Sequence, residues 1–135
     1  MTVRLSATSV LDDELADAKT NWGFVNAKQA APASATVHCF VAPAAGTIQY
    51  FAAKAGTGAG VGESSTLDLQ IGGVSCLTGA VVVNEASGTN VVAGTVDVAA
   101  DDIAAGDVIS VANVYVAGGA PAQADLEFDI HFKLA

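Results

Sequence analysis

The chain has 135 residues, which is enough for one domain with a hydrophobic core but too few for two independently stable domains. Hydrophobic residues make up 52% of it and charged residues 14%, yet no apolar run approaches the roughly 20 residues of a membrane-spanning helix. The formal net charge of −9 argues against nucleic-acid binding, because an acidic surface repels phosphate. We therefore expect neither a membrane nor a nucleic acid as a partner.

The charge is unevenly distributed along the chain. Residues 1–54 sum to zero, whereas residues 55–132 carry ten acidic side chains and no Lys or Arg. One interpretation is that the acidic surface keeps the protein soluble. The other is that the acidic body faces outward while the neutral N-terminal part docks onto a partner. The first residues carry a single charge, at Arg4, and do not resemble a secretory signal. We expect the protein to stay in the cytoplasm where it is made, unless lysis releases it.

Residues 1–33 differ in composition from the rest and are predicted to form an N-terminal arm. One short helix is expected over residues 11–19, where a serine precedes three acidic residues and a lysine lies near the end. The aromatic residues that follow are of types that favour interfaces. The arm either folds back to cap the body, with Trp22 as a plug, or reaches a neighbouring subunit or another protein. The candidate partner-binding residues are Val3, Arg4, Leu5, Trp22 and Phe24.

Residues 34–135 are predicted to form one all-β domain, a jelly-roll-like β-sandwich of seven or eight antiparallel strands. Gly and Pro turns occur about every ten residues, as in sandwiches and barrels. The strands are expected over residues 36–42, 47–53, 65–71, 74–78, 79–83, 91–99, 108–116 and 124–134. Strict alternation predicts Val37, Cys39 and Val41 opposite His38 and Phe40, and Ile48 and Tyr50 opposite Gln49 and Phe51.

The last two strands give the clearest patterns. In residues 124–134 five apolar side chains alternate with charged or polar ones, so one face must be covered by a second apolar surface. In residues 108–116 apolar side chains occupy both faces, which predicts that both are covered. Gly72 and Gly73 separate two alternating runs and predict a two-residue hairpin turn, because glycine tolerates positive φ.

No motif in the chain indicates catalysis. Asp101, Asp102 and Asp107 offer oxygen ligands of the kind calcium prefers, but their spacing is not that of an EF-hand and Asp is common in turns. The glycine-rich residues 56–62 lack the Lys-Ser/Thr pair and the helix of a phosphate-binding loop. No nucleophile motif accompanies either histidine. We expect no catalytic residue, no metal and no cofactor, and we do not expect an enzyme.

Cys39 and Cys76 are the two cysteines of the chain. Both lie in predicted strands, where Cys commonly serves as a small buried hydrophobe. The alternative is a disulfide bond, which a reducing compartment disfavours. A zinc site that added His38 and His131 would lack the usual ligand spacing.

Three runs in residues 41–133 carry a resemblance to a known group of proteins. They are Ala45-Gly-Thr-Ile-Gln-Tyr-Phe51, Thr66-Leu-Asp-Leu-Gln-Ile-Gly-Gly-Val-Ser75 and Asp101-Asp-Ile-Ala-Ala-Gly-Asp-Val-Ile-Ser-Val111. Their order is similar to that in trimer-forming jelly-roll modules of phage heads and fibres. The chain therefore resembles the small tailed-phage virion proteins that decorate or cement the capsid.

The resemblance implies a structural virion protein, assembled in the host cytoplasm and located on the outer surface of the capsid. Its partners would be the major capsid protein and further copies of itself, most simply in a homotrimer. An alternative is a receptor- or carbohydrate-binding module of a head fibre or tail fibre, and a bacterial surface-layer subunit ranks below it. The aromatic side chains available to a sugar-binding platform are Trp22, Phe24, Tyr50 and Tyr115.

Overall fold

The structure is a computed structural model that describes residues 21–135. The helix predicted over residues 11–19 and the candidates Val3, Arg4 and Leu5 lie outside these residues. The described part of the chain folds into β-strands, without a helix. The strands are β1 (Trp22–Gln29), β2 (Ala35–Val41), β3 (Gly46–Thr57), β4 (Ser64–Ile71), β5 (Val74–Ser75), β6 (Val81–Asn84), β7 (Val92–Ala93), β8 (Asp102–Ile103), β9 (Val108–Val116) and β10 (Ala124–Leu134).

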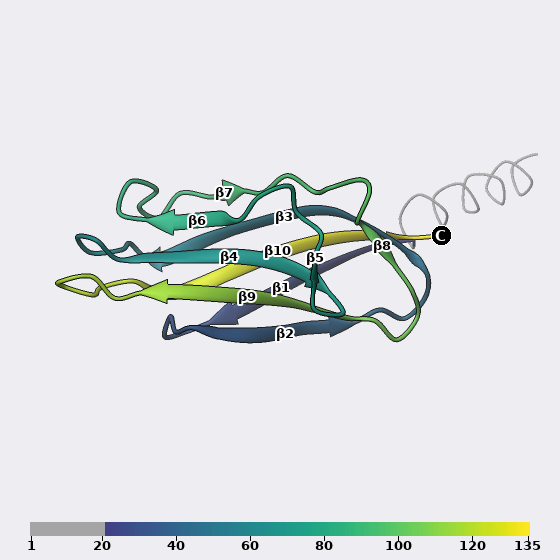
Figure 1. The fold of residues 1–135 in the computed structure, drawn as a ribbon, viewed down its shortest axis with the longest axis horizontal. Helices are drawn as coiled ribbons and strands as arrows, with labels where there is room; N and C mark the ends of the chain where they lie inside the picture. Colours follow the sequence, from purple (N-terminus) through teal and green to yellow (C-terminus); the bar gives the residue numbers. More distant parts are fainter. Residues whose placement is uncertain (1–20) are drawn as a thin grey trace, which may run out of the picture.

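The strands form two antiparallel sheets of five strands each. In sheet A the order is β1-β10-β3-β7, and β8 also pairs with β3. In sheet B the order is β2-β9-β4-β5, and β6 also pairs with β4. Figure 1 shows the strands running along the long axis of the molecule, so that the connecting loops gather at its two ends. The prediction that residues 34–135 form an all-β domain is confirmed.

The hydrophobic core is built from the inward side chains of both sheets. Leu126, Phe128, Ile130 and Phe132 of β10 are buried, which confirms the alternation predicted for this strand. Sheet B contributes its own inward residues to the same cluster, among them Leu67, Leu69, Ile109 and Val111. The predicted hairpin turn at Gly72 and Gly73 is also present, with φ values of 57° and 85°. The two sheets thus cover each other's apolar faces.

A β-bulge in β2 makes the faces predicted for that strand wrong. The register with β9 shifts between His38 and Phe40, and a bulge of this kind reverses the alternation beyond it. Phe40 turns inward and stacks on Phe132, with ring centroids 4.7 Å apart. Val41, expected to lie beside Val37, is 59% exposed instead.

A second register shift lies between β10 and β3. Tyr50 pairs with His131 and Ile48 pairs with Phe132, so Gln49 is an extra residue on β3. Ile48 and Phe51 are both buried in the core, although strict alternation predicted them on opposite faces. Tyr50 is left on the outer face, half-buried.

Part of the predicted arm is a strand of sheet A. Residues 22–29 form β1, which pairs with β10 along its whole length. Its inward positions include Gly23 and Ala27, and a Cβ at Gly23 would lie 2.0 Å from the Phe132 ring. Because these inward side chains are small, the sequence shows little hydrophobic alternation here. Trp22 lies at the start of this strand, and its ring stacks on that of Phe24.

Two other expectations for sheet residues were wrong. The strand expected over residues 91–99 is limited to β7 and an isolated bridge between Leu77 and Val96, and Val98 is 85% exposed. The strand β9 has the predicted bounds, but its outer face is not covered. Val114 and Val116 on that face are 63% and 52% exposed.

Candidate interaction surface

Strand β1 places two of the predicted partner-binding residues on the outer face of sheet A. Trp22 and Phe24 alternate with inward residues, and Phe24 is 67% exposed. Phe24 pairs with His131 of β10, which in turn pairs with Tyr50 of β3. Directly opposed residues in neighbouring strands lie on the same face. Side chains from three strands, distant in the sequence, therefore meet on one face.

These four side chains, Trp22, Phe24, His131 and Tyr50, form what we call the aromatic row. The rings of Trp22 and Phe24 are nearly parallel, with centroids 6.3 Å apart and an interplanar angle of 11°. Phe24 meets His131 edge to face at 4.7 Å, and Tyr50 lies 4.8 Å from the other side of the imidazole. Such contacts hold the rings in place without burying them. The result is a rigid, partly exposed aromatic surface.

Charged and polar side chains continue the same face along the strands. The carboxylate of Glu127 lies between two lysines, 3.4 Å from Lys28 Nζ and 3.5 Å from Lys54 Nζ. Asn26 and Asp129 lie between these charges and the aromatic row, and Asn26 Nδ2 donates a 2.7 Å hydrogen bond to Asp129 Oδ1. Because these pairs are exposed, they contribute little to stability. They fix the order of side chains beside the aromatic row.

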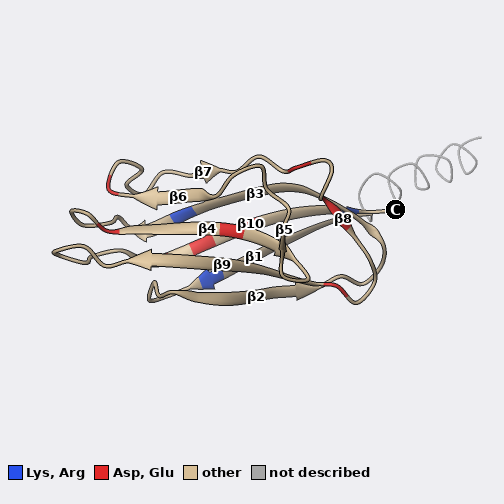
Figure 2. Cartoon of the chain, viewed as in Figure 1, with Lys and Arg blue, Asp and Glu red and all other residues tan. Residues whose placement is uncertain are grey.

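The lysines of the described residues are all on sheet A. Lys28 lies on β1, Lys54 on β3 and Lys133 on β10, as the blue segments of Figure 2 show. Four acidic residues share this sheet, Asp102 on β8 and Asp125, Glu127 and Asp129 on β10, and the other six of the described residues lie on β4 and in the loops. Positive and negative charges therefore nearly balance on sheet A, whereas the loops of the described residues carry acidic side chains alone. Sheet A is the part of the described chain that offers positive charges to an acidic partner.

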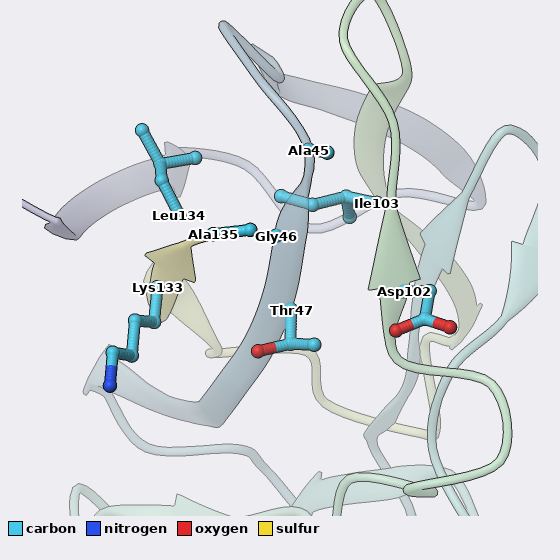
Figure 3. Close-up of a pocket in the computed structure, with 8 residues that line it drawn as sticks. All are labelled: Ala45, Gly46, Thr47, Asp102, Ile103, Lys133, Leu134 and Ala135. Carbon is cyan, nitrogen blue, oxygen red and sulfur yellow. The ribbon is translucent and has the colours of Figure 1, made fainter.

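A shallow pocket of about 370 Å³ lies at the end of sheet A near the C-terminus. It is lined by Ala45, Gly46, Thr47, Asp102, Ile103, Lys133, Leu134 and Ala135. Figure 3 shows the charged groups of Asp102 and Lys133 on opposite sides of this pocket, so they do not converge on a common point. Most of its wall is apolar, and it lacks the convergent polar groups of a typical ligand site.

A buried carboxylate organises the opposite end of the sandwich. Glu63 is 1% exposed, and its Oε1 accepts hydrogen bonds from the backbone N–H groups of Gly60 (2.8 Å), Ala122 (2.8 Å) and Gln123 (2.7 Å). Its Oε2 accepts a hydrogen bond from the Tyr115 hydroxyl. Burial opposes ionisation, but these donors outweigh it and hold the pKa of Glu63 at about 2. The bond to Glu63 and burial raise the pKa of the Tyr115 hydroxyl.

Tyr115 is therefore separate from the aromatic row. Its role is to help fasten the loop between β9 and β10 to the loop between β3 and β4. The neighbouring polar groups extend this connection into the sandwich, since Ser65 Oγ donates to Gln123 Oε1 at 2.5 Å. Asn113 Nδ2 donates to Gln29 Oε1 at 2.8 Å, which links β9 to β1. This buried network has a structural explanation and leaves the aromatic row as the candidate site.

The remaining reactive groups are dispersed. Cys39 and Cys76 are free thiols, and burial raises their pKa values to about 11 and about 12. Among residues 21–135 no three His, Cys, Asp or Glu side chains are grouped to hold a metal ion. The same residues include no helix long and apolar enough to cross a membrane.

The chain matches no protein-family model and no curated protein. Its fold is similar to a solved chain of the Cyanophage Pam1 capsid asymmetric unit, with a TM-score of 0.62 and 11% sequence identity. The similarity covers 85% of this chain and 86% of that chain, so the two are close in length. At this identity, the comparison establishes a shared fold.

Sequence reasoning named Trp22, Phe24 and Tyr50 together as aromatic side chains available to a sugar-binding platform, although it placed Tyr50 on the face of Ile48. It also included Tyr115, which lies elsewhere, and it did not include His131. The signal for β1 was present in the alternation of Phe24, Asn26 and Lys28 with smaller residues. No local pattern marks Glu63, because its partners Ala122 and Gln123 are about sixty positions away.

Proposed function

We propose that the protein is a structural component of a phage virion, namely a capsid decoration or cement protein. It would bind the assembled lattice of the major capsid protein on the outer surface of the particle, after assembly in the host cytoplasm. The observation that carries this proposal is the fold shared with a chain of a cyanophage capsid asymmetric unit along most of both chains. The sequence resemblance to capsid decoration proteins points to the same class.

The strand order supports a jelly-roll topology, which is common in viral capsid domains. The first strand β1 lies beside the last strand β10, and the second strand β2 lies beside the next-to-last strand β9. The strands β3 and β4 pair with β10 and β9 in their turn. A jelly roll presents two broad outer faces and two sets of loops. Such a shape suits a subunit that contacts both the shell and its own copies, in this proposal as a homotrimer.

The aromatic row is the surface that we assign to the capsid. Partly exposed Trp and Phe side chains are favoured anchors of protein interfaces, and the stacking with His131 holds them in position before binding. The three lysines of sheet A offset its acidic residues, which reduces repulsion between an acidic decoration protein and its partner. A protein that binds the assembled shell but not its free subunits stabilises the shell by mass action.

The test is co-sedimentation of the purified chain with expanded empty capsids of the phage that encodes it. We expect saturable binding by the wild-type chain and roughly a tenfold to hundredfold loss of affinity in Phe24→Ser. The matched control is Val74→Ser, because Val74 is also 67% exposed but lies on β5 of the other sheet. Failure of the wild-type chain to bind would contradict the proposed function. Equal loss in both variants would contradict the assignment of the face.

The aromatic row also favours a second function, that of a receptor- or carbohydrate-binding module. Aromatic faces stack on sugar rings, and Trp22, Phe24 and Tyr50 are gathered on one face. The discriminating measurement is titration calorimetry with purified host-surface polysaccharide. Polysaccharide binding that depends on Phe24, together with no capsid binding, would replace the cement function with this one.

A further inference from the structure

The outer face of sheet B carries an exposed apolar patch, which we call the valine face. Its centre consists of Val82 on β6, Thr66 on β4 and Ala112, Val114 and Val116 on β9. Thr66 pairs with Val114 on one side and with Val82 on the other, so the three side chains form a continuous row across three strands. Val82, Val114 and Val116 are 41%, 63% and 52% exposed. Exposed apolar patches of this kind commonly mark an interface.

The valine face is almost free of formal charge. The strands β2, β5, β6 and β9 contain no Lys, Arg, Asp or Glu, as the uniform tan of β2, β6 and β9 in Figure 2 shows. The exception in sheet B is Asp68 on β4, whose carboxylate oxygens accept hydrogen bonds from Ser75 Oγ (2.5 Å) and Gln70 Nε2 (3.2 Å). This face therefore differs from a body that is otherwise acidic.

We propose that the valine face is where copies of this chain meet one another. Two chains with a net charge of −9 repel each other at most orientations, and contact through a face whose single formal charge is Asp68 minimises that repulsion. In a homotrimer each contact joins two different patches, so both patches need few charges rather than a surface that complements itself. A cationic partner would instead select the acidic loops, and an acidic one would select sheet A.

The size of the valine face is consistent with a second copy of the chain as its partner. The strands β2, β9, β4 and β6 have seven, nine, eight and four residues. At about 3.3 Å per residue and about 4.8 Å between strands, their outer face covers roughly 440 Å² per copy. Two such faces bury roughly 900 Å² together, which is close to the roughly 1,000 Å² expected of a specific interface. The inference deepens the homo-oligomer part of the proposed function and rests on sheet B, whereas the capsid contact was assigned to sheet A.

The experiment is multi-angle light scattering of the full chain over a range of concentrations. We expect an oligomer for the wild-type chain and at least a hundredfold weaker self-association for Val114→Lys, because this change buries an unpaired charge in an apolar contact. The control Val98→Lys places the same charge on a valine that is 85% exposed and outside both sheets, and it should leave the oligomer unchanged. Circular dichroism verifies that both variants are folded.

Three outcomes would overturn the proposal. The first is a wild-type chain that stays monomeric at every concentration, and the second is an oligomer that Val114→Lys leaves intact. The third is a monomeric chain whose binding to capsids, rather than to itself, is lost in Val114→Lys, because the occupant would then be the capsid protein. Capsid binding by a monomer that depends on Phe24 would refute self-association while the cement function stands.

Discussion

The substitution Glu63→Gln tests whether one buried carboxylate holds two loops of the sandwich together. Glutamine has nearly the same size and keeps one carbonyl oxygen for the three backbone N–H groups that Glu63 Oε1 accepts. It removes the charge, and it replaces Oε2, which accepts from the Tyr115 hydroxyl, with an NH2 group that can only donate. The change therefore alters the hydrogen bonding of the side chain while leaving its packing nearly unchanged.

The expected cost follows from the four hydrogen bonds to the carboxylate. A charge-assisted bond contributes about 1.5–3 kcal/mol against about 0.5–1.5 kcal/mol for a neutral one, so the loss is roughly 1 kcal/mol per bond. Removing a buried charge returns part of that sum, because its desolvation penalty disappears. We expect a fall of roughly 2 kcal/mol in the free energy of unfolding at pH 7.

The pH dependence gives a sharper signature than the magnitude. The pKa of Glu63 is lowered from 4.5 to about 2 in the folded chain, because the hydrogen bonds to the carboxylate outweigh its desolvation. A lowered pKa contributes stability that is complete above the unfolded value and is lost as the pH falls toward the folded value. The difference between wild type and Glu63→Gln should therefore be full at pH 7 and shrink between pH 4.5 and pH 2.

Urea unfolding followed by circular dichroism at several pH values measures this difference directly. The control is Glu85→Gln, which removes the charge of an exposed residue in the loop after β6 and should change stability by less than about 0.5 kcal/mol. A difference for Glu63→Gln that is the same at pH 7 and pH 3 would refute the reasoning. So would a variant as stable as the wild type at pH 7.

Two further predictions concern the core. Phe128 is fully buried between the sheets, so Phe128→Ala should lower the free energy of unfolding by about 3–5 kcal/mol. The control Val98→Ala, on an exposed loop, should have little effect. Thermal unfolding measures both variants, and a similar small shift in melting temperature for the two would contradict the described core. The thiols of Cys39 and Cys76, with pKa values raised to about 11 and about 12, should be unreactive toward Ellman's reagent at pH 7.5 in the native chain and both reactive in urea. Rapid reaction of both native thiols would contradict their burial.

The sequence predicted the elements whose periodicity is undisturbed. The strand bounds of 108–116 and 124–134 and the turn at Gly72 and Gly73 were correct, because long alternating runs and paired glycines depend on local chemistry alone. Face assignments failed in β2 and β3, where a single extra residue in a bulge reverses the alternation. A bulge is chosen by the pairing of two strands, so its position is not encoded in either strand by itself.

The candidate site was only half predictable for a related reason. Phe24 could be selected by its residue type, whereas its contact with His131 and Tyr50 depends on the register of β1 with β10 and of β10 with β3. Those registers bring together positions that are 107 and 81 residues apart in sequence (131 − 24 and 131 − 50). The Glu63 network is non-local in the same way. Residue type suggests which side chains bind a partner, and topology decides which of them do so together.

The two outer faces of the sandwich differ in a manner that alternation alone explains. On β10 the core residues alternate with Glu127, Asp129 and His131, so sheet A presents charges and rings to the outside. On β9 they alternate with Ala112, Val114 and Val116, so sheet B presents small apolar side chains. If the outer side of β9 only faced solvent, polar residues would be expected at these positions instead of valine. The same period of two that builds one core therefore leaves one face suited to a heterologous partner and the other to a copy of itself.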